Sequence, residues 1–268
     1  MLIRFLSVFL TVGAVVAAVA GAAVSGGTPP SPVTVDAVDY AYAMPPTLEG
    51  PVVALRLRNR GKELHEFSLG RVDGTHTVAD VIAAFEARKE PAWLLDVGGP
   101  GLVSPGATLT YTRILKPGRY VFLCAVPDHA GRSHLQHGMI RAFTVTGGGS
   151  TTTPTPAAVI TAAKRGFVVP AIGAGTQTLE LRNRAGAGRG FLLATLNPGK
   201  TQADVERWTK QIEGTGKQPR GAMPMTLLGA TQTIRSGASV FVTVKLDAGR
   251  SYHVSDDESG AEATFTPR

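Results

Sequence analysis

The chain has 268 residues, a single cysteine and a formal net charge of +7, from 27 Lys and Arg against 20 Asp and Glu. That length suits two domains of ordinary size. One cysteine excludes an intramolecular disulfide. The basic excess comes without a Lys/Arg run or interleaved aromatic residues, which argues against nucleic-acid binding.

Residues 1–27 have the pattern of an export signal. Arg4 supplies an early positive charge, an apolar run follows at residues 5–23, and Ala20-Gly21-Ala22 offers a cleavage site of the A-x-A type. The alternative is an uncleaved anchor helix, because the run is close to the ~20 apolar residues that cross a bilayer. With cleavage, we expect an exported protein of the medium, the cell wall or the periplasm, without a membrane span.

Residues 32–146 are predicted to form a first domain built mainly of short strands. One helix interrupts the strands, because Thr77 and Asp80 match a capping box ahead of an amphipathic run. The strand segments alternate polar and apolar residues or are rich in β-branched and aromatic types, with Gly and Pro turns between them. They are residues 33–40, 52–59, 108–115 and 120–124. The pattern favours a Greek-key β-sandwich.

Candidate metal ligands gather at the end of this domain, and one more lies upstream at His65. The only cysteine is followed by three of the six histidines and then by a methionine: Cys124, His129, His134, His137 and Met139. One thiolate, imidazoles and a thioether are the ligand set of a blue-copper electron-transfer site.

The segment GGGSTTTPTP at residues 147–156 reads as a linker, and the sequence repeats on its two sides. The matching pairs are LRLRNR at 55–60 with LELRNR at 179–184, and residues 104–124 with 235–255. A repeat of this length indicates a second copy of the same domain at residues 157–268. The expected fold is therefore mainly β, with two tandem Greek-key β-sandwich domains that each contain one short helix.

The second copy keeps the apolar pattern but lacks the candidate ligands. Aligned without a gap, Arg189 stands in the place of His65 and Ser255 in the place of Cys124, and no histidine-rich loop follows. A fixed positive charge at Arg189 opposes the binding of a cation. We expect the second copy to fold by itself, without metal.

The first copy resembles the cupredoxins, the family of plastocyanin, azurin and the type 1 domains of copper oxidases. The resemblance rests on His65 after an Asn-Arg-Gly turn, on the strand GRYVFLC that ends at Cys124, and on Gly138-Met139 before a last strand. It extends to the second copy only as fold. In that family the matching positions supply two histidines, a cysteine and an axial methionine to one copper. The resemblance therefore implies copper as the cofactor, with His65, Cys124 and Met139 among its ligands.

The loop between Cys124 and Met139 leaves the second imidazole open between two histidines. His129 keeps the family's spacing from the cysteine, whereas His134 keeps its spacing to the methionine, and the two lie five positions apart. One histidine therefore cannot satisfy both spacings. We favour His134. We expect His137 to be exposed, or to contact one of the metal ligands without binding the metal itself.

The resemblance implies an electron carrier that serves a redox partner protein, rather than an enzyme. A multicopper oxidase needs further histidines beside the cysteine, where this chain has Leu123 and Ala125. Motifs for serine hydrolases, zinc proteases and phosphate loops are also missing from the sequence. The remaining alternative is a metal-free binding or structural module of the cell envelope that carries a relic copper site.

Overall fold

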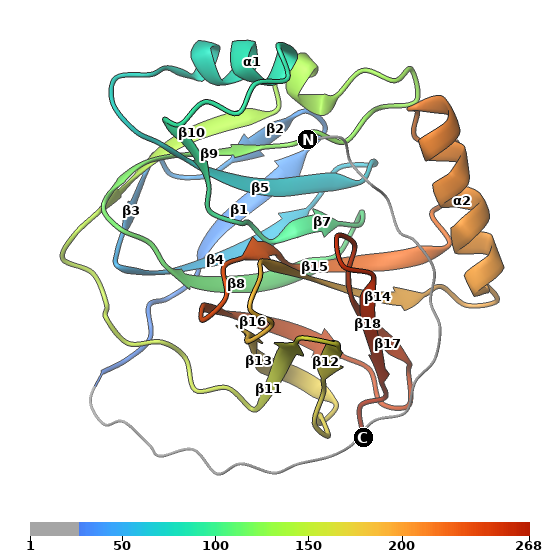
Figure 1. Ribbon diagram of the computed structural model, residues 1–268. Coiled ribbons are helices and arrows are strands. Elements are labelled where there is room, and N and C mark those ends of the chain that lie inside the picture. Colours follow the sequence, from blue (N-terminus) through green and yellow to red (C-terminus); the bar gives the residue numbers. More distant parts are fainter. Residues whose placement is uncertain (1–26) are drawn as a thin grey trace.

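A computed structural model describes residues 27–268 of the chain (Figure 1). The export signal predicted at residues 1–27 lies, apart from its last residue, outside the described residues. Within residues 27–268, no helix combines the length and the apolar character that a membrane span requires.

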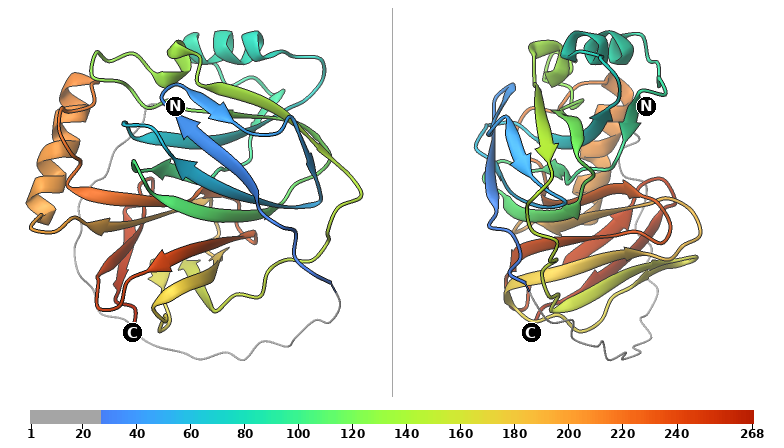
Figure 2. Two further views of the ribbon diagram at one scale, coloured as in Figure 1. Left: turned by 180° about the vertical axis from the view of Figure 1, so that it is seen from behind. Right: turned by 90° about the vertical axis from the view of Figure 1, so that its left-hand side faces the viewer.

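The fold is mainly β, as predicted, and consists of two long sheets that face each other (Figures 1 and 2). The 8-stranded sheet has the order β12 (Gly166–Val168), β11 (Ala158–Ala163), β13 (Gly175–Asn183), β16 (Ser239–Leu246), β8 (Thr108–Ile114), β4 (Val52–Asn59), β1 (Val33–Val38), β2 (Ala41–Ala43). The 10-stranded sheet has the order β18 (Ala261–Phe265), β17 (Tyr252–Asp256), β14 (Arg189–Leu196), β15 (Met225–Ile234), β7 (Gly101–Val103), β5 (His65–Val72), β9 (Gly118–Leu123), β10 (Ile140–Thr146), β3 (Thr47–Glu49), with β6 (Leu94–Asp96) paired to β5.

The two copies share one topology. In the first copy β4 lies between β1, its parallel neighbour, and β8, its antiparallel neighbour. In the second copy β13 has the same relation to β11 and β16. Alternate residues of β4 and β13 point into the core, among them Leu55, Leu57, Leu179 and Leu181, all of which are buried. The period of two that predicted these strands is thus the period of their buried faces.

The two copies are joined edge to edge in both layers. In one sheet β8 pairs with β16, with Thr112 opposite Phe241, and in the other β7 pairs with β15 at Val103 and Leu228. The larger of the two hydrophobic cores within residues 27–268 includes buried residues of both halves, such as Val35 and Val254. The tandem repeat therefore forms one continuous two-layer structure, and residues 147–156 run along its side rather than separating two bodies. The boundaries given for the two domains remain a prediction.

Each copy contains the predicted helix, and each helix begins with the predicted capping box. Helix α1 (Val78–Glu86) is capped by Thr77 and Asp80, and helix α2 (Gln202–Thr215) by Thr201 and Asp204. In both cases the threonine hydroxyl accepts the amide of the aspartate, and the aspartate carboxylate accepts the amide of the threonine, which satisfies donors that a helix start leaves unpaired. A third, short 3₁₀ helix, η1 (His134–His137), follows Ser133, whose side chain caps it in the same way with Gln136.

The sandwich also corrects the sequence alignment by one residue. Leu69 lies opposite Phe122 in the first copy, and Leu193 lies opposite Val254 in the second. The aromatic stack of Tyr120 on Phe143 recurs as Tyr252 on Phe265. The second copy has one extra residue between its Gly-Arg turn and this tyrosine. Asp256, and not Ser255 as the gapless alignment predicts, therefore occupies the position of Cys124.

Candidate metal centre

Three elements of the first copy bring candidate ligands to one place. His65 is the first residue of β5, Cys124 directly follows β9, and His134 begins η1. The turn before His65 is held by Asn59, whose side-chain amide donates to the carbonyls of Glu63 (2.9 Å) and Val103 (2.7 Å). The asparagine of the repeated Asn-Arg motif therefore positions the strand end on which His65 sits.

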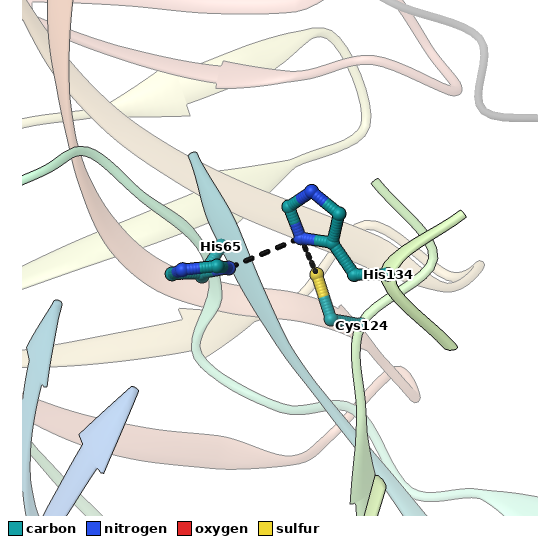
Figure 3. Close-up of side chains that lie close together, drawn as sticks. All are labelled: His65, Cys124 and His134. Carbon is teal, nitrogen blue, oxygen red and sulfur yellow. Dashed lines mark hydrogen bonds between the residues drawn. The ribbon is translucent and has the colours of Figure 1, made fainter. Parts of the chain in front are cut away.

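His65, Cys124 and His134 converge with their donor atoms inside the protein (Figure 3). The Nδ1 atoms of the two histidines are 3.1 Å apart, and Nδ1 of His134 lies 3.3 Å from Sγ of Cys124. All three residues are fully buried. Two imidazole nitrogens at this distance need a proton or a cation between them, since two lone pairs would otherwise face each other. Two imidazoles and a thiol form a donor set that suits a soft or borderline metal ion.

Burial keeps the two imidazoles neutral. It lowers the pKa of His65 to about 4, with the neighbouring His134 acting in the same direction and Asp39 opposing it. Burial also lowers the pKa of His134, against the opposing effect of Glu63. Neutral imidazoles have a free lone pair, which is the form that binds a metal.

The thiol of Cys124 has the opposite shift. Burial, with the Glu66 carboxylate nearby, raises its pKa well above the ordinary range. The backbone amide of Glu66 donates to Sγ over 3.2 Å. Without a cation the sulfur therefore keeps its proton, and a bound cation replaces that proton as the positive charge beside it.

The outer nitrogens of both imidazoles face carboxylates. Nε2 of His134 donates to Oε2 of Glu63 over 2.8 Å, and Nε2 of His65 lies 3.4 Å from Oδ1 of Asp39. The hydrogen bond to Glu63 holds the proton of His134 on Nε2 and leaves its Nδ1 as the metal-binding atom. Nε2 of His65 makes no such hydrogen bond, so Asp39 contributes only its negative charge nearby. A Cβ added at Gly61 would lie 2.5 Å from Nε2 of His65, so this position has no room for a larger residue.

Met139 is adjacent to the group through its backbone. It is fully buried, its carbonyl accepts the amide of Cys124 (3.2 Å), and its amide donates to the carbonyl of His134 (2.9 Å). Gly138, at φ 95°, makes the tight left-handed turn between η1 and Met139. The His–Met spacing that the sequence analysis singled out is thus the spacing of this turn.

The other two histidines of the loop point elsewhere. Nδ1 of His129 donates to the carbonyl of Gln218 in the second copy over 2.8 Å. Nε2 of His137 donates to Asp128 over 2.9 Å, and its ring stacks on Tyr40 with ring centres 4.4 Å apart. The structure therefore brings His134, and not His129, into the group with His65 and Cys124.

Two residues near the group escaped the sequence analysis, Glu63 and Asp39. Glu63 precedes His65 by two positions, and this closeness is a usable signal, since a carboxylate often accompanies a ligand histidine. Asp39 belongs to the turn between β1 and β2. Its place beside His65 depends on the pairing of β1 with β4, which no local pattern reveals.

In the second copy an ion pair stands at the matching positions. Nε of Arg189 lies 3.6 Å from Oδ2 of Asp256, and their side chains are 16% and 2% exposed. Asp256 also accepts the amide of Gly190 over 2.9 Å and the hydroxyl of Ser259. Among the described residues of this copy, no three His, Cys, Asp or Glu side chains converge as they do in the first.

Neither a protein-family model nor a curated protein sequence matches the chain. Among solved structures, it is similar to auracyanin from Roseiflexus castenholzii (23% identity, 42% of this chain and 94% of the other, TM-score 0.28). It is also similar to an azurin from Methylomonas sp. strain J (16%, 41% and 95%, 0.28) and to a Cu-containing nitrite reductase from Thermus scotoductus SA-01 (13%, 89% and 61%, 0.24). The mainly β sandwich of residues 27–268 and the buried group of His65, Cys124 and His134 fit a cupredoxin-like family.

Proposed function

We propose that the first copy binds one copper ion through His65, Cys124 and His134, with the thioether of Met139 as a weaker ligand, and that the protein carries single electrons. The observation that carries this proposal is that His65, Cys124 and His134, all buried, each bring one ligand atom within 4.8 Å of the other two. A thiolate, two imidazoles and a thioether suit both Cu(I) and Cu(II), so copper held by these residues would supply one-electron chemistry with little rearrangement of the protein.

The chain's own residues prepare this site in three ways. Burial holds His65 and His134 neutral, as described above. Glu63 accepts the outer nitrogen of His134 and so favours Nδ1 of His134 as the donor, while the Asp39 carboxylate adds negative charge beside His65. The amide of Glu66 donates to the sulfur of Cys124 and stabilises its thiolate form. Binding of Cu(II) would require Cys124 to release its thiol proton to solvent.

An electron carrier fits better than a copper enzyme. An enzyme needs an open coordination position or a second metal, whereas the three donors are fully buried. Within residues 27–268 only one group of side chains has the spacing of a metal site. The signal-like residues 1–27 support export, and an exported carrier would serve a redox partner protein outside the cytoplasm.

The test is a titration of metal-free protein with Cu(II), followed by visible absorption. We expect an intense thiolate-to-copper band that saturates at one equivalent, and a reversible one-electron wave in voltammetry. Cys124→Ser and His134→Ala should abolish the band. His76→Ala, which removes a histidine beside α1, should leave it unchanged. A wild-type protein that stays colourless and retains no copper would support the relic site instead.

A further inference from the structure

The second copy lies against the surroundings of the metal centre at two separate points, although it has no ligands of its own. The first point is Gln232, on β15. Its side-chain amide donates from Nε2 to Oε1 of Glu66 over 2.8 Å. Two hydrogen bonds to Gly99 fix Gln232 to the first copy. The backbone amide of Gln232 donates to the carbonyl of Gly99 (2.6 Å), and its side-chain Oε1 accepts the backbone amide of Gly99 (3.1 Å).

Glu66 also makes hydrogen bonds at the cysteine. Its backbone amide donates to Sγ of Cys124 over 3.2 Å, and its Oε2 accepts the amide of Ala125, the next residue, over 3.2 Å. One carboxylate thus ties the strand of His65, the strand end of Cys124 and the second copy together. Hydrogen bonding around the cysteine sulfur is one of the features that tune the potential of such a site.

The second point is the loop between Cys124 and His134. The amide of Gln218, just beyond α2, donates to the carbonyl of Asp128 over 3.1 Å. In return, Nδ1 of His129 donates to the carbonyl of Gln218 over 2.8 Å. Gln218 is only 8% exposed, so this contact is largely closed to water. The backbone of Gln218 therefore fixes the position of the loop through two hydrogen bonds.

Asp128 spreads this contact through the rest of the loop. Its Oδ1 accepts the amides of Ala130 (2.7 Å) and Arg132 (2.9 Å), and its Oδ2 accepts Nε2 of His137 (2.9 Å). His137 closes η1, the short helix that begins with His134. The stretch from Cys124 to His134 is five residues longer than the family's spacing, and it contains the residues that reach the second copy.

We propose that the second copy is a brace for the metal centre of the first: Gln232, through Glu66, fixes the hydrogen bond on the Cys124 sulfur, and the Gln218–His129 contact fixes the loop that presents His134. This proposal rests on the proposed copper site. It accounts for a repeat that kept the fold and lost the ligands, because a brace needs a rigid sheet edge and no metal. Replacing a residue that orients a metal-ligating side chain typically changes the metal affinity by about 10–100-fold.

Two substitutions test the two points separately. Gln232→Leu removes the amide that holds Glu66, so the hydrogen bond to the sulfur weakens and the thiolate donates more strongly. We expect the potential to shift downward while the copper band remains. His129→Ala removes the side-chain contact to Gln218, and we expect copper to dissociate to a chelator about 10-fold faster. Gln211→Ala, at an exposed position of α2 in the second copy, is the matched control and should change neither quantity.

The readouts separate this proposal from a general loss of stability and from the copper proposal. A loss of stability alone would lower the unfolding temperature of the metal-free variants without moving the potential. If both variants keep the potential and the dissociation rate of Gln211→Ala, the brace is wrong and the copper site stands. If wild-type protein forms no copper band, both proposals are wrong.

Discussion

At the scale of single residues, the decisive property of the site is that its histidines are buried and neutral. His65 has no exposed surface, and burial lowers its pKa from 6.5 to about 4. In the unfolded chain the same imidazole titrates near 6.5. Between these two values the unfolded chain binds a proton that the folded, metal-free protein does not, so folding is linked to pH in this range.

We therefore predict that the metal-free protein loses stability as pH falls from 6.5 towards 4. The sign follows because a lowered folded-state pKa stabilises the fold above the unfolded pKa, and this stability decreases as protons bind to the unfolded chain. For His65 the full effect is about 3 kcal/mol. Urea unfolding after copper removal, at pH 7 and pH 5, should show about 2 kcal/mol of this effect. In His65→Asn the pH dependence should be shallower, and an unchanged slope would contradict the prediction.

The residues of the site show how far the sequence alone could lead. The types and order of His65, Cys124 and Met139 were enough to propose a copper site. Loop spacing could not choose between His129 and His134, because the choice depends on where the loop is held. His129 is drawn away by the carbonyl of Gln218, 89 positions further along the chain. A contact of that range has no signature in local spacing.

At the scale of elements, the strand pairs β5–β9 and β14–β17 carry different chemistry on the same frame. In the first copy the strand ends present His65 and Cys124, and in the second they present Arg189 and Asp256. The gapless alignment missed this pair, because an inserted residue ahead of β17 shifts the strand by one position. The burial of alternate residues shows the shift, since Tyr252, Val254 and Asp256 face inward.

We predict that the pair of Arg189 and Asp256 is costly to break. Arg189→Leu leaves the Asp256 carboxylate buried without its cation, which should lower the free energy of unfolding by about 3–5 kcal/mol. The matched control is Arg207→Leu, which removes an exposed ion pair to Asp204 and should cost about 0–1 kcal/mol.

Denaturant unfolding of the metal-free variants measures both costs. Adding Asp256→Asn to Arg189→Leu should restore part of the loss, because asparagine still accepts the Gly190 amide but carries no charge. Equal costs for Arg189→Leu and Arg207→Leu would show that the Asp256 carboxylate does not need its partner.

At the scale of the whole molecule, the sequence predicted two copies of a sandwich but not their union. The repeat and its alternating strands identify each copy, since they reflect the core face of each strand. The joining of β8 to β16 depends on backbone groups at two strand edges. The sequence of an edge strand that pairs with another strand has the same pattern as that of one that faces water. Exposed edges invite pairing, and here each copy covers an edge of the other.

We therefore predict that the two halves unfold together and that copper stabilises both. The chain has two tryptophans, with Trp93 in the first copy and Trp208 on α2 of the second. Trp208→Phe leaves a reporter for the first copy, and Trp93→Phe leaves one for the second. Because the sheets are continuous and the main core contains residues of both copies, thermal unfolding followed by fluorescence should give the same midpoint for both reporters.

Added copper then discriminates between a joined and a modular molecule. A ligand that binds only the native state raises its midpoint, so copper at the first copy should raise the midpoint reported by Trp208 as much as that reported by Trp93. Cys124→Ser in each single-tryptophan background is the control, and copper should leave its midpoint unchanged. Two midpoints, with copper moving only the one at Trp93, would mean that the strand pairing between copies is too weak to couple them. The brace would then hold the metal centre only by local contacts.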